Sequence, residues 1–272
     1  MREISDIQEL QEIELGILRH IHSVCNQQGL SFYLSNGTLL GAVKYQGFIP
    51  WDDDIDLLMP RTDYEKLMHS ELIANDRYQL CARERNARWR LPFAKLCDTR
   101  TRLYEGNADF GIPYGVGIDI FPLDAWSGGK AQALRCSVWR RGLSASVKAR
   151  FATPKKGVSR GILWCIWVTA RLFGSEFFLR KIDHELQKGR IAHTPDFVGS
   201  VAWPLYGKKE VIPVNVFSGN VFLKFEGEFY PVPRGYDVYL RRLYGKYEED
   251  PPTEKQRTHH SFRAYWLEST SD

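Results

Sequence analysis

The chain has 272 residues, 43% hydrophobic and 26% charged, so it is long enough to bury the core of one large domain. A formal net charge of +4 is too small to argue by itself for nucleic-acid binding. Five scattered cysteines without a CxxC pair indicate a reduced protein without structural zinc. The N-terminus, MREISDIQELQEIEL, is too charged for a signal peptide. These features together predict a folded cytoplasmic protein.

The first predicted element is a helix over residues 4–27, because apolar residues recur there every three or four positions. Ser5 is expected to start it in a capping box and Gly29 to end it. A strand is predicted over 30–35, and the NGT at 36–38 predicts a turn before a short helix.

The remaining elements alternate between helix and strand. In chain order, the patterns predict a strand over 54–59, a helix capped by Thr62 and Glu65 that ends near Ile73, strands near 78–82, 91–97 and 115–121, mostly helix over 129–190 with a break at TPKKG, a hairpin over 221–232, and a last helix from about Arg234 to Gly245. This mixture predicts an α/β (α+β) protein with a mixed sheet.

Positive charge is concentrated in the middle of the chain. From Lys130 to Lys181 there are twelve Lys and Arg and one acid, Glu176. This stretch includes GILWCIWVTARLFG, residues 161–174, which is shorter than the roughly 20 apolar residues that span a bilayer. It predicts either a buried core helix or a helix that rests on an anionic membrane surface, and the sequence leaves both open.

The stretch FIPWDDDIDLLMP, residues 48–60, places four aspartates between apolar residues. Alternate residues of a strand face the same side, so Asp54 and Asp56 are expected to point together, and Asp52 joins them if the strand begins early. Two carboxylates on one face repel each other unless a cation lies between them, and hard oxygen ligands suit Mg²⁺ or Mn²⁺. The cluster therefore predicts a metal site held by a strand.

Other interpretations of the cluster fit less well. A calcium EF-hand needs Gly at position 57 and Glu at 63, where the chain has Leu57 and Asp63. A solvated acidic turn is disfavoured by the apolar neighbours Trp51 and Ile55. The chain also has neither a P-loop nor the paired histidines of a zinc protease.

A glycine turn precedes the acidic cluster. Gly37 and Thr38 come 17 residues before Asp54, and the N–H groups of such a turn and of a helix N-terminus can cradle phosphate. The aspartates would then hold a metal that neutralises charge in phosphoryl transfer. This layout is similar to the nucleotidyltransferase superfamily, whose third carboxylate comes from a later strand; Asp119 and Asp124 are the candidates here.

The resemblance becomes specific in SNGTLLGAVKYQGFIPWDDDIDLLMPRTDYEKL, residues 35–67, which closely resembles the signature of the LicD family. That family includes bacterial phosphocholine transferases, with fukutin-related proteins as distant relatives. The match continues in FAKLCDTRT (93–101), GIDIFPLD (117–124) and YLRRLYGKYEEDPPTEKQRTHH (239–260). It implies one nucleotidyltransferase-like catalytic domain over 1–272, with a helical basic insertion over 125–195.

The resemblance also implies catalytic and metal-binding roles for three aspartates. Asp54 and Asp56 match the family's metal aspartates, and Asp119 matches its later acidic position, as third ligand or as general base. The implied cofactor is Mg²⁺, with Mn²⁺ as the alternative.

Five further residues are expected to bind substrate. Gly37 and Thr38 form the glycine turn, and Lys95 matches a basic position suited to a donor phosphate. His259 and His260 match a C-terminal pair whose role the pattern does not define.

The implied reaction is metal-dependent transfer of phosphocholine from CDP-choline to a hydroxyl of a surface glycan, such as a lipid-linked teichoic acid, lipopolysaccharide or capsule precursor. One alternative is transfer of another phospho-alcohol or sugar phosphate (ethanolamine, glycerol, ribitol or hexose) from its nucleotide-activated donor. Others are a nucleotidyltransferase acting on nucleic acid and a non-catalytic membrane scaffold. We expect no nucleic-acid partner, a cytoplasmic location, and peripheral contact of residues 130–180 with the anionic inner membrane surface.

Overall fold

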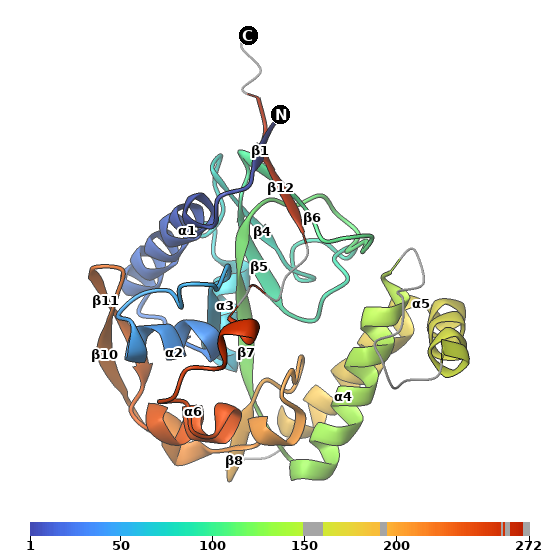
Figure 1. Cartoon of the computed structure of the whole chain (residues 1–272). Coiled ribbons are helices and arrows are strands. Elements are labelled where there is room, and N and C mark those ends of the chain that lie inside the picture. Colours follow the sequence, from blue (N-terminus) through green and yellow to red (C-terminus); the bar gives the residue numbers. More distant parts are fainter. Residues whose placement is uncertain (149–159, 191–194, 257, 259–261, 269–272) are drawn as a thin grey trace.

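We analysed a computed structural model of the chain, which describes residues 1–148, 160–190, 195–256, 258 and 262–268 (Figure 1). Its helices are α1 (Ile7–Gln28), α2 (Asn36–Lys44), α3 (Arg61–His69), α4 (Gly129–Ser146), α5 (Arg160–Arg190) and α6 (Tyr236–Tyr244). Its strands are β1 (Arg2–Ile4), β2 (Tyr33–Leu34), β3 (Asp56–Pro60), β4 (Tyr78–Cys81), β5 (Ala94–Asp98), β6 (Thr101–Tyr104), β7 (Gly117–Ala125), β8 (Phe197–Gly199), β9 (Ile212–Pro213), β10 (Asn220–Phe225), β11 (Glu228–Pro233) and β12 (Arg263–Trp266).

A mixed sheet forms the centre of the molecule. Within the described ranges, seven strands build it in the order β2-β3-β7-β5-β4, with β8 pairing to β7 and β9 to β8. β3 and β7 run parallel, whereas the other pairs are antiparallel. The long strand β7 crosses the middle of Figure 1. The predicted α/β (α+β) class with a mixed sheet is confirmed.

The amphipathic helix α1 packs against β5 and β7. Its buried stripe includes Leu10, Ile13, Ile17 and Ile21, the periodic positions from which the helix was predicted. Burying one such side chain contributes about 1.5–3 kcal/mol, so this stripe fixes α1 onto the strands that carry the site.

The ends of α1 confirm one predicted boundary and correct the other. Gly29 ends the helix at φ 63°, in the left-handed region. At the start, the cap is Asp6, whose side chain accepts a hydrogen bond from the Gln8 N–H, so the predicted capping box at Ser5 is wrong. Ile4 lies in β1, which pairs with β12 and so joins both ends of the chain (Figure 1).

The boundaries of four elements around the acidic stretch also differ from expectation. The strand expected over 30–35 is reduced to β2, and α2 begins at Asn36 where a turn was expected. β3 begins at Asp56 rather than at Asp54. Ahead of it the chain forms a turn in which the Asp52 N–H donates a hydrogen bond to the Ile49 carbonyl. The start of α3 follows Pro60 directly, so Thr62 lies inside that helix and does not cap it.

The hairpin of β10 and β11 is confirmed. Its turn residues Glu226 (φ 47°) and Gly227 (φ 87°) are both left-handed, the conformation that two-residue hairpin turns require. The predicted strands near 78–82, 91–97 and 115–121 correspond to β4, β5 and β7. β6, β8, β9 and β12 were not predicted, because each has only two to four residues and short strands leave little periodicity to detect.

The basic segment forms α4 and α5, which pack together at one side of the sheet (Figure 1). α5 is kinked at Gly174, where φ is 72° and ψ 169°; the break predicted at TPKKG lies outside the described residues. Trp164, Leu172 and Phe173 are 53%, 82% and 55% exposed, so the interpretation as a buried core helix is wrong for these side chains. None of the helices that the structure describes is long and apolar enough to cross a bilayer.

Candidate active site

A row of charged residues crosses three neighbouring strands. Asp56 of β3 is paired in register with Asp119 of β7, and Asp119 is paired with Lys95 of β5. Lys95 Nζ lies 2.5 Å from Asp119 Oδ1. Burial disfavours the charge on Lys95, but Asp119 and Glu105 outweigh it and hold the Lys95 pKa well above its usual value. The parallel β3–β7 pairing therefore brings together residues 63 positions apart in the sequence.

Asp56 is held in place through both its side chain and its backbone. Its side chain accepts a hydrogen bond from Asn36 Nδ2 at 3.0 Å, and its backbone N–H donates to Thr38 Oγ1 at 2.8 Å. Burial, followed by repulsion from Asp54 and Asp119, raises the Asp56 pKa well above its usual value. Burial likewise raises the pKa of Asp119 to about 6, against the opposing effect of Lys95.

The loop before β3 adds further carboxylates. One oxygen from each of Asp52, Asp53 and Asp54 lies within 4.8 Å of the others. Strand alternation was the reason for expecting Asp54 and Asp56 to point together; Asp54 instead lies ahead of the strand, yet both line the same pockets. Thr258 Oγ1 donates to Asp53 Oδ2 at 2.6 Å, so the C-terminal segment reaches this loop.

Glu14 is an acidic site residue that the sequence analysis missed. It lies on α1, is 4% exposed, and faces the pocket that holds Asp54 and Asp119. Its Oε2 is buried and has no hydrogen-bond partner among the described residues. Burial, followed by repulsion from Asp54, raises its pKa well above the usual value. The available signal was a charge at position 14 inside the apolar stripe of α1.

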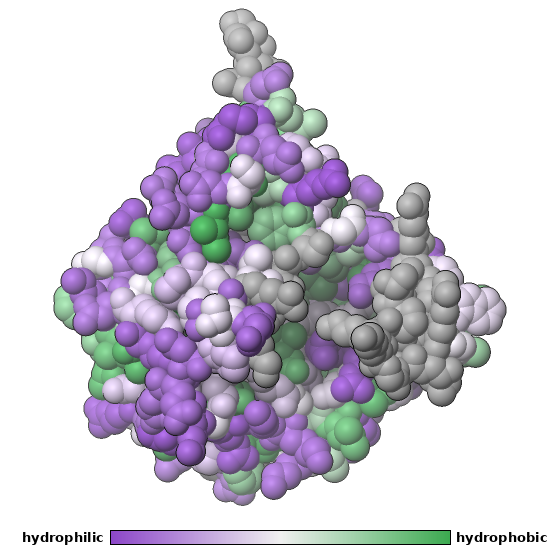
Figure 2. All heavy atoms as spheres, viewed as in Figure 1, coloured by the Kyte–Doolittle hydropathy of each residue, from purple (hydrophilic) through white to green (hydrophobic). Residues whose placement is uncertain are grey.

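Two large pockets share Asp54 and Asp56 in the described part of the chain. The first, which we call the Phe93 pocket, measures about 500 Å³ and includes Glu14, Phe93, Lys95, Asp119, Phe121 and Trp203. The second, the Gly37 pocket, measures about 660 Å³ and includes Gly37, Lys44, Trp51, Tyr206, Lys246 and Tyr247. Figure 2 shows a hollow with hydrophobic residues between the body of the molecule and the α4–α5 side. The carboxylates thus stand where two cavities meet.

Gly37 and Thr38 lie in the first turn of α2. A Cβ on Gly37 would lie 2.5 Å from Asp52 Oδ2, so a larger residue there would displace the Asp52 carboxylate. Thr38 is buried, and its Oγ1 accepts the Asp56 N–H. The Thr38 bond holds the acidic stretch against the N-terminus of α2, where the helix dipole favours negative charge.

The predicted substrate-binding roles of Gly37, Thr38 and Lys95 stay predictions. Lys95 points into the Phe93 pocket but is paired with Asp119. His259 and His260 lie outside the described residues. Their described neighbours Thr258 and Phe262 both reach the site.

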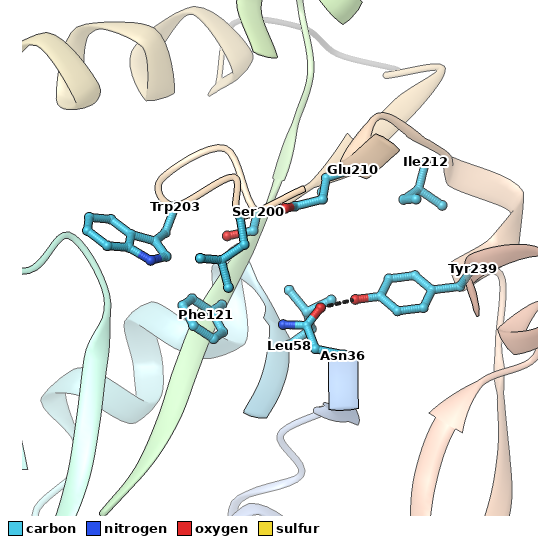
Figure 3. A pocket seen from close by; sticks show the side chains of 10 residues that line it. Asn36, Leu58, Phe121, Ser200, Trp203, Glu210, Ile212 and Tyr239 are labelled. Carbon is cyan, nitrogen blue, oxygen red and sulfur yellow. Dashed lines mark hydrogen bonds between the residues drawn. The ribbon is translucent and has the colours of Figure 1, made fainter. Parts of the chain in front are cut away.

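A third cavity lies behind Asn36 (Figure 3). It measures about 10 Å³, room for about one water molecule, which is too small for a substrate. In this view the Tyr239 hydroxyl points at the Asn36 side chain and donates to its Oδ1 at 3.0 Å. Asn36 therefore connects α6 to the carboxylate of Asp56.

The residues present fit a divalent metal ion. The donors are carboxylate oxygens, which Mg²⁺ and Mn²⁺ prefer. They are held close together and partly buried, at the expense of raised pKa values for Asp56 and Glu14. A bound cation would remove this repulsion. Asp54 and Asp56 remain the predicted ligands, with Asp119 or the neighbouring loop aspartates completing the set.

Comparisons with known proteins agree with this architecture. Residues 29–132 match the model of the LicD/FKTN/FKRP nucleotidyltransferase domain. Over 267 residues the chain is 29% identical to the lipopolysaccharide cholinephosphotransferase LicD of Haemophilus influenzae, covering 96% of this chain and 98% of that protein. A 41-residue stretch, 15% of this chain, is 39% identical to uncharacterized proteins of Rickettsia prowazekii and Rickettsia typhi, covering 15% and 13% of those proteins.

The mixed sheet, the acidic site and these matches define an enzyme, a transferase with a nucleotidyltransferase domain. More narrowly, the match to the LicD/FKTN/FKRP domain is joined by a similarity to the Haemophilus LicD protein that extends over 96% of this chain.

Proposed function

We propose that this transferase moves phosphocholine from CDP-choline to a hydroxyl of a cell-surface glycan precursor, with Mg²⁺ or Mn²⁺ as cofactor. The observation that carries the proposal is the position of Asp54 and Asp56 at the junction of two large pockets. In an in-line phosphoryl transfer the attacking hydroxyl of the acceptor and the leaving nucleotide lie on opposite sides of the reacting phosphorus. The likeness to the Haemophilus cholinephosphotransferase supports the choice of donor and of lipopolysaccharide as the class of acceptor.

The Gly37 pocket suits the nucleotide part of the donor. It contains the first turn of α2 and two basic residues, Lys44 and Lys246, which are chemically suited to a diphosphate. Trp51 and Tyr247 add aromatic surface on which a base can stack. Lys44 is paired with Asp250 in the structure, so donor binding there would exchange this exposed carboxylate for phosphate.

The Phe93 pocket suits a cationic head group and the acceptor. Phe93 packs against Phe121 and Trp203, with ring centroids 4.5 and 5.4 Å apart. Aromatic faces bind quaternary ammonium ions. Glu14, whose buried Oε2 has no hydrogen-bond partner among the described residues, lines the same pocket. Arg140 lies over the Trp203 ring at 5.5 Å, a contact of the same cation–π kind within the protein.

The metal would be held by Asp54 and Asp56, with Asp119 as third ligand, and would supply charge neutralisation at the diphosphate. The chain's own residues orient the donor and exclude water. The acceptor hydroxyl must also lose its proton as it attacks. Asp119 is engaged with Lys95, which favours a ligand role for Asp119 over a role as that base.

Contact with an anionic membrane is a further part of the proposal. α5 exposes Trp164, Leu172 and Phe173, and the exposed cation Arg171 directly precedes Leu172. Apolar side chains with neighbouring positive charge are the chemistry of helices that bind anionic lipid surfaces. Such contact would bring the site to a lipid-linked acceptor at the cytoplasmic face.

Release of CMP tests the reaction. It should require CDP-choline, acceptor and Mg²⁺ or Mn²⁺, and should be slower with CDP-ethanolamine, whose head group makes fewer contacts with aromatic faces. Far better use of CDP-glycerol, CDP-ribitol or a nucleotide sugar would overturn the phosphocholine assignment and favour the alternative phospho-group donors. Labelling of RNA by nucleoside triphosphates would instead favour a nucleic-acid nucleotidyltransferase.

A further inference from the structure

Asp56 is held by a chain of two hydrogen bonds that starts on α6. The Tyr239 hydroxyl donates to Asn36 Oδ1, and Asn36 Nδ2 donates to Asp56 Oδ2, both at 3.0 Å. Tyr239 is 4% exposed and Asp56 8%, so little water competes for either bond. The three residues come from α6, α2 and β3, and Tyr239 lies 203 positions from Asn36.

The chemistry of the three groups fixes the direction of the chain. As a metal ligand, Asp56 is an ionised carboxylate that only accepts hydrogen bonds, so the amide of Asn36 must turn its NH₂ group toward it. Its carbonyl oxygen then faces Tyr239, whose hydroxyl can donate to it. Removing the hydroxyl would free the amide to rotate, and Asp56 would lose a fixed donor.

The backbone conformation at position 36 favours asparagine over most other residues. Its φ is 45°, in the left-handed region, where asparagine is among the few residues found with any frequency. This conformation lies at the start of α2, next to Gly37. The side chain points toward Tyr239 (Figure 3) and also donates to Asp56.

We propose that Asn36 and Tyr239 are positioning residues that set the orientation of the Asp56 carboxylate toward the metal. The inference rests on the proposed function, in which Asp56 is a metal ligand. Partners that hydrogen-bond to a metal ligand fix its rotation and strengthen metal binding. The arrangement also gives a role to the segment from Tyr239 onward, which resembles the family but includes none of the metal aspartates.

Two variants test the hydrogen bonds between Tyr239, Asn36 and Asp56. Asn36→Gly keeps the left-handed backbone without strain and removes the amide, so Mn²⁺ affinity should fall about 10–100-fold. Tyr239→Phe removes one hydroxyl, so affinity should fall about 2–10-fold. The matched control is Tyr78→Phe, another buried tyrosine, whose hydroxyl donates to the Gly16 carbonyl at 3.2 Å; its Mn²⁺ affinity should equal that of the wild type.

Mn²⁺ binding is measured without substrate by electron paramagnetic resonance, with thermal unfolding to verify the fold. In CMP-release assays, both variants should need more Mn²⁺ for half-maximal rate. For Tyr239→Phe, KM for CDP-choline at saturating metal should stay within about twofold of the wild type, because Tyr239 lines neither large pocket. Wild-type Mn²⁺ affinity in a folded Tyr239→Phe protein would overturn the proposal. A wild-type chain that binds Mn²⁺ but does not release CMP would overturn the proposed function instead.

Discussion

Replacement of Asp56 by asparagine separates the electrostatic and the catalytic consequences of the site. The amide is nearly isosteric, and its oxygen can still accept the hydrogen bond from Asn36 Nδ2. Asp56 and Asp119 are register partners on adjacent strands, and adjacent strands are about 5 Å apart. At an effective dielectric constant near 20 their repulsion is at most about 3 kcal/mol.

Lys95 already neutralises much of the Asp119 charge, so Asp56→Asn should raise the free energy of unfolding by only about 0–1 kcal/mol. Without metal, the variant should therefore unfold at the wild-type temperature or up to about 4 °C higher. With Mg²⁺ at about 100 times its Kd, the wild type gains about 2.7 kcal/mol and the variant little. The order of stability should then reverse, and transfer should fall at least about 100-fold.

Thermal unfolding in EDTA and in Mg²⁺, together with CMP release, measures both effects. The control is Asp196→Asn, an exposed aspartate on the loop before β8, which should change neither. Wild-type turnover in Asp56→Asn, or an undiminished response of its stability to Mg²⁺, would refute the metal assignment.

Three further outcomes are expected. Burial raises the pKa of Glu210 from 4.5 to about 8, so its contribution to stability is complete below pH 4.5 and is lost as pH rises to about 8. Between these values the free energy of unfolding of Glu210→Gln should rise relative to the wild type by up to about 1.4 kcal/mol per pH unit. A constant difference between the two proteins in urea unfolding from pH 5 to 8 would contradict this. Trp203→Ala should raise KM for CDP-choline by up to about 30-fold through lost cation–π contact and change KM for CDP-glycerol less; equal changes would remove the head-group assignment. Vesicles with anionic lipid should bind the protein at low salt and release it at high salt, whereas equal binding to neutral vesicles would indicate a hydrophobic anchor, and no binding would exclude the proposed surface.

Helices and strands could be predicted from the sequence where apolar residues recur at a regular spacing or where a residue suited to a left-handed turn marks an end. The stripe of α1 and its end at Gly29 are of this kind, as is the hairpin whose turn requires left-handed residues at Glu226 and Gly227. Boundaries failed where two local signals compete. Ser5 and Asp6 are both good helix caps, and in the structure the Asp6 side chain takes the Gln8 N–H.

The sequence by itself determined that four aspartates gather after a glycine turn, because these residues are neighbours along the chain. Only the tertiary structure decided what surrounds them. The parallel pairing of β3 with β7 brings Asp119 beside Asp56, and the packing of α1 on the sheet turns Glu14 into the same pocket. Tyr239 reaches the site from a helix about 200 residues away. A local pattern reports which face of an element is buried, but not which other element covers it, so the partners of each carboxylate are set by contacts that no local stretch of sequence contains.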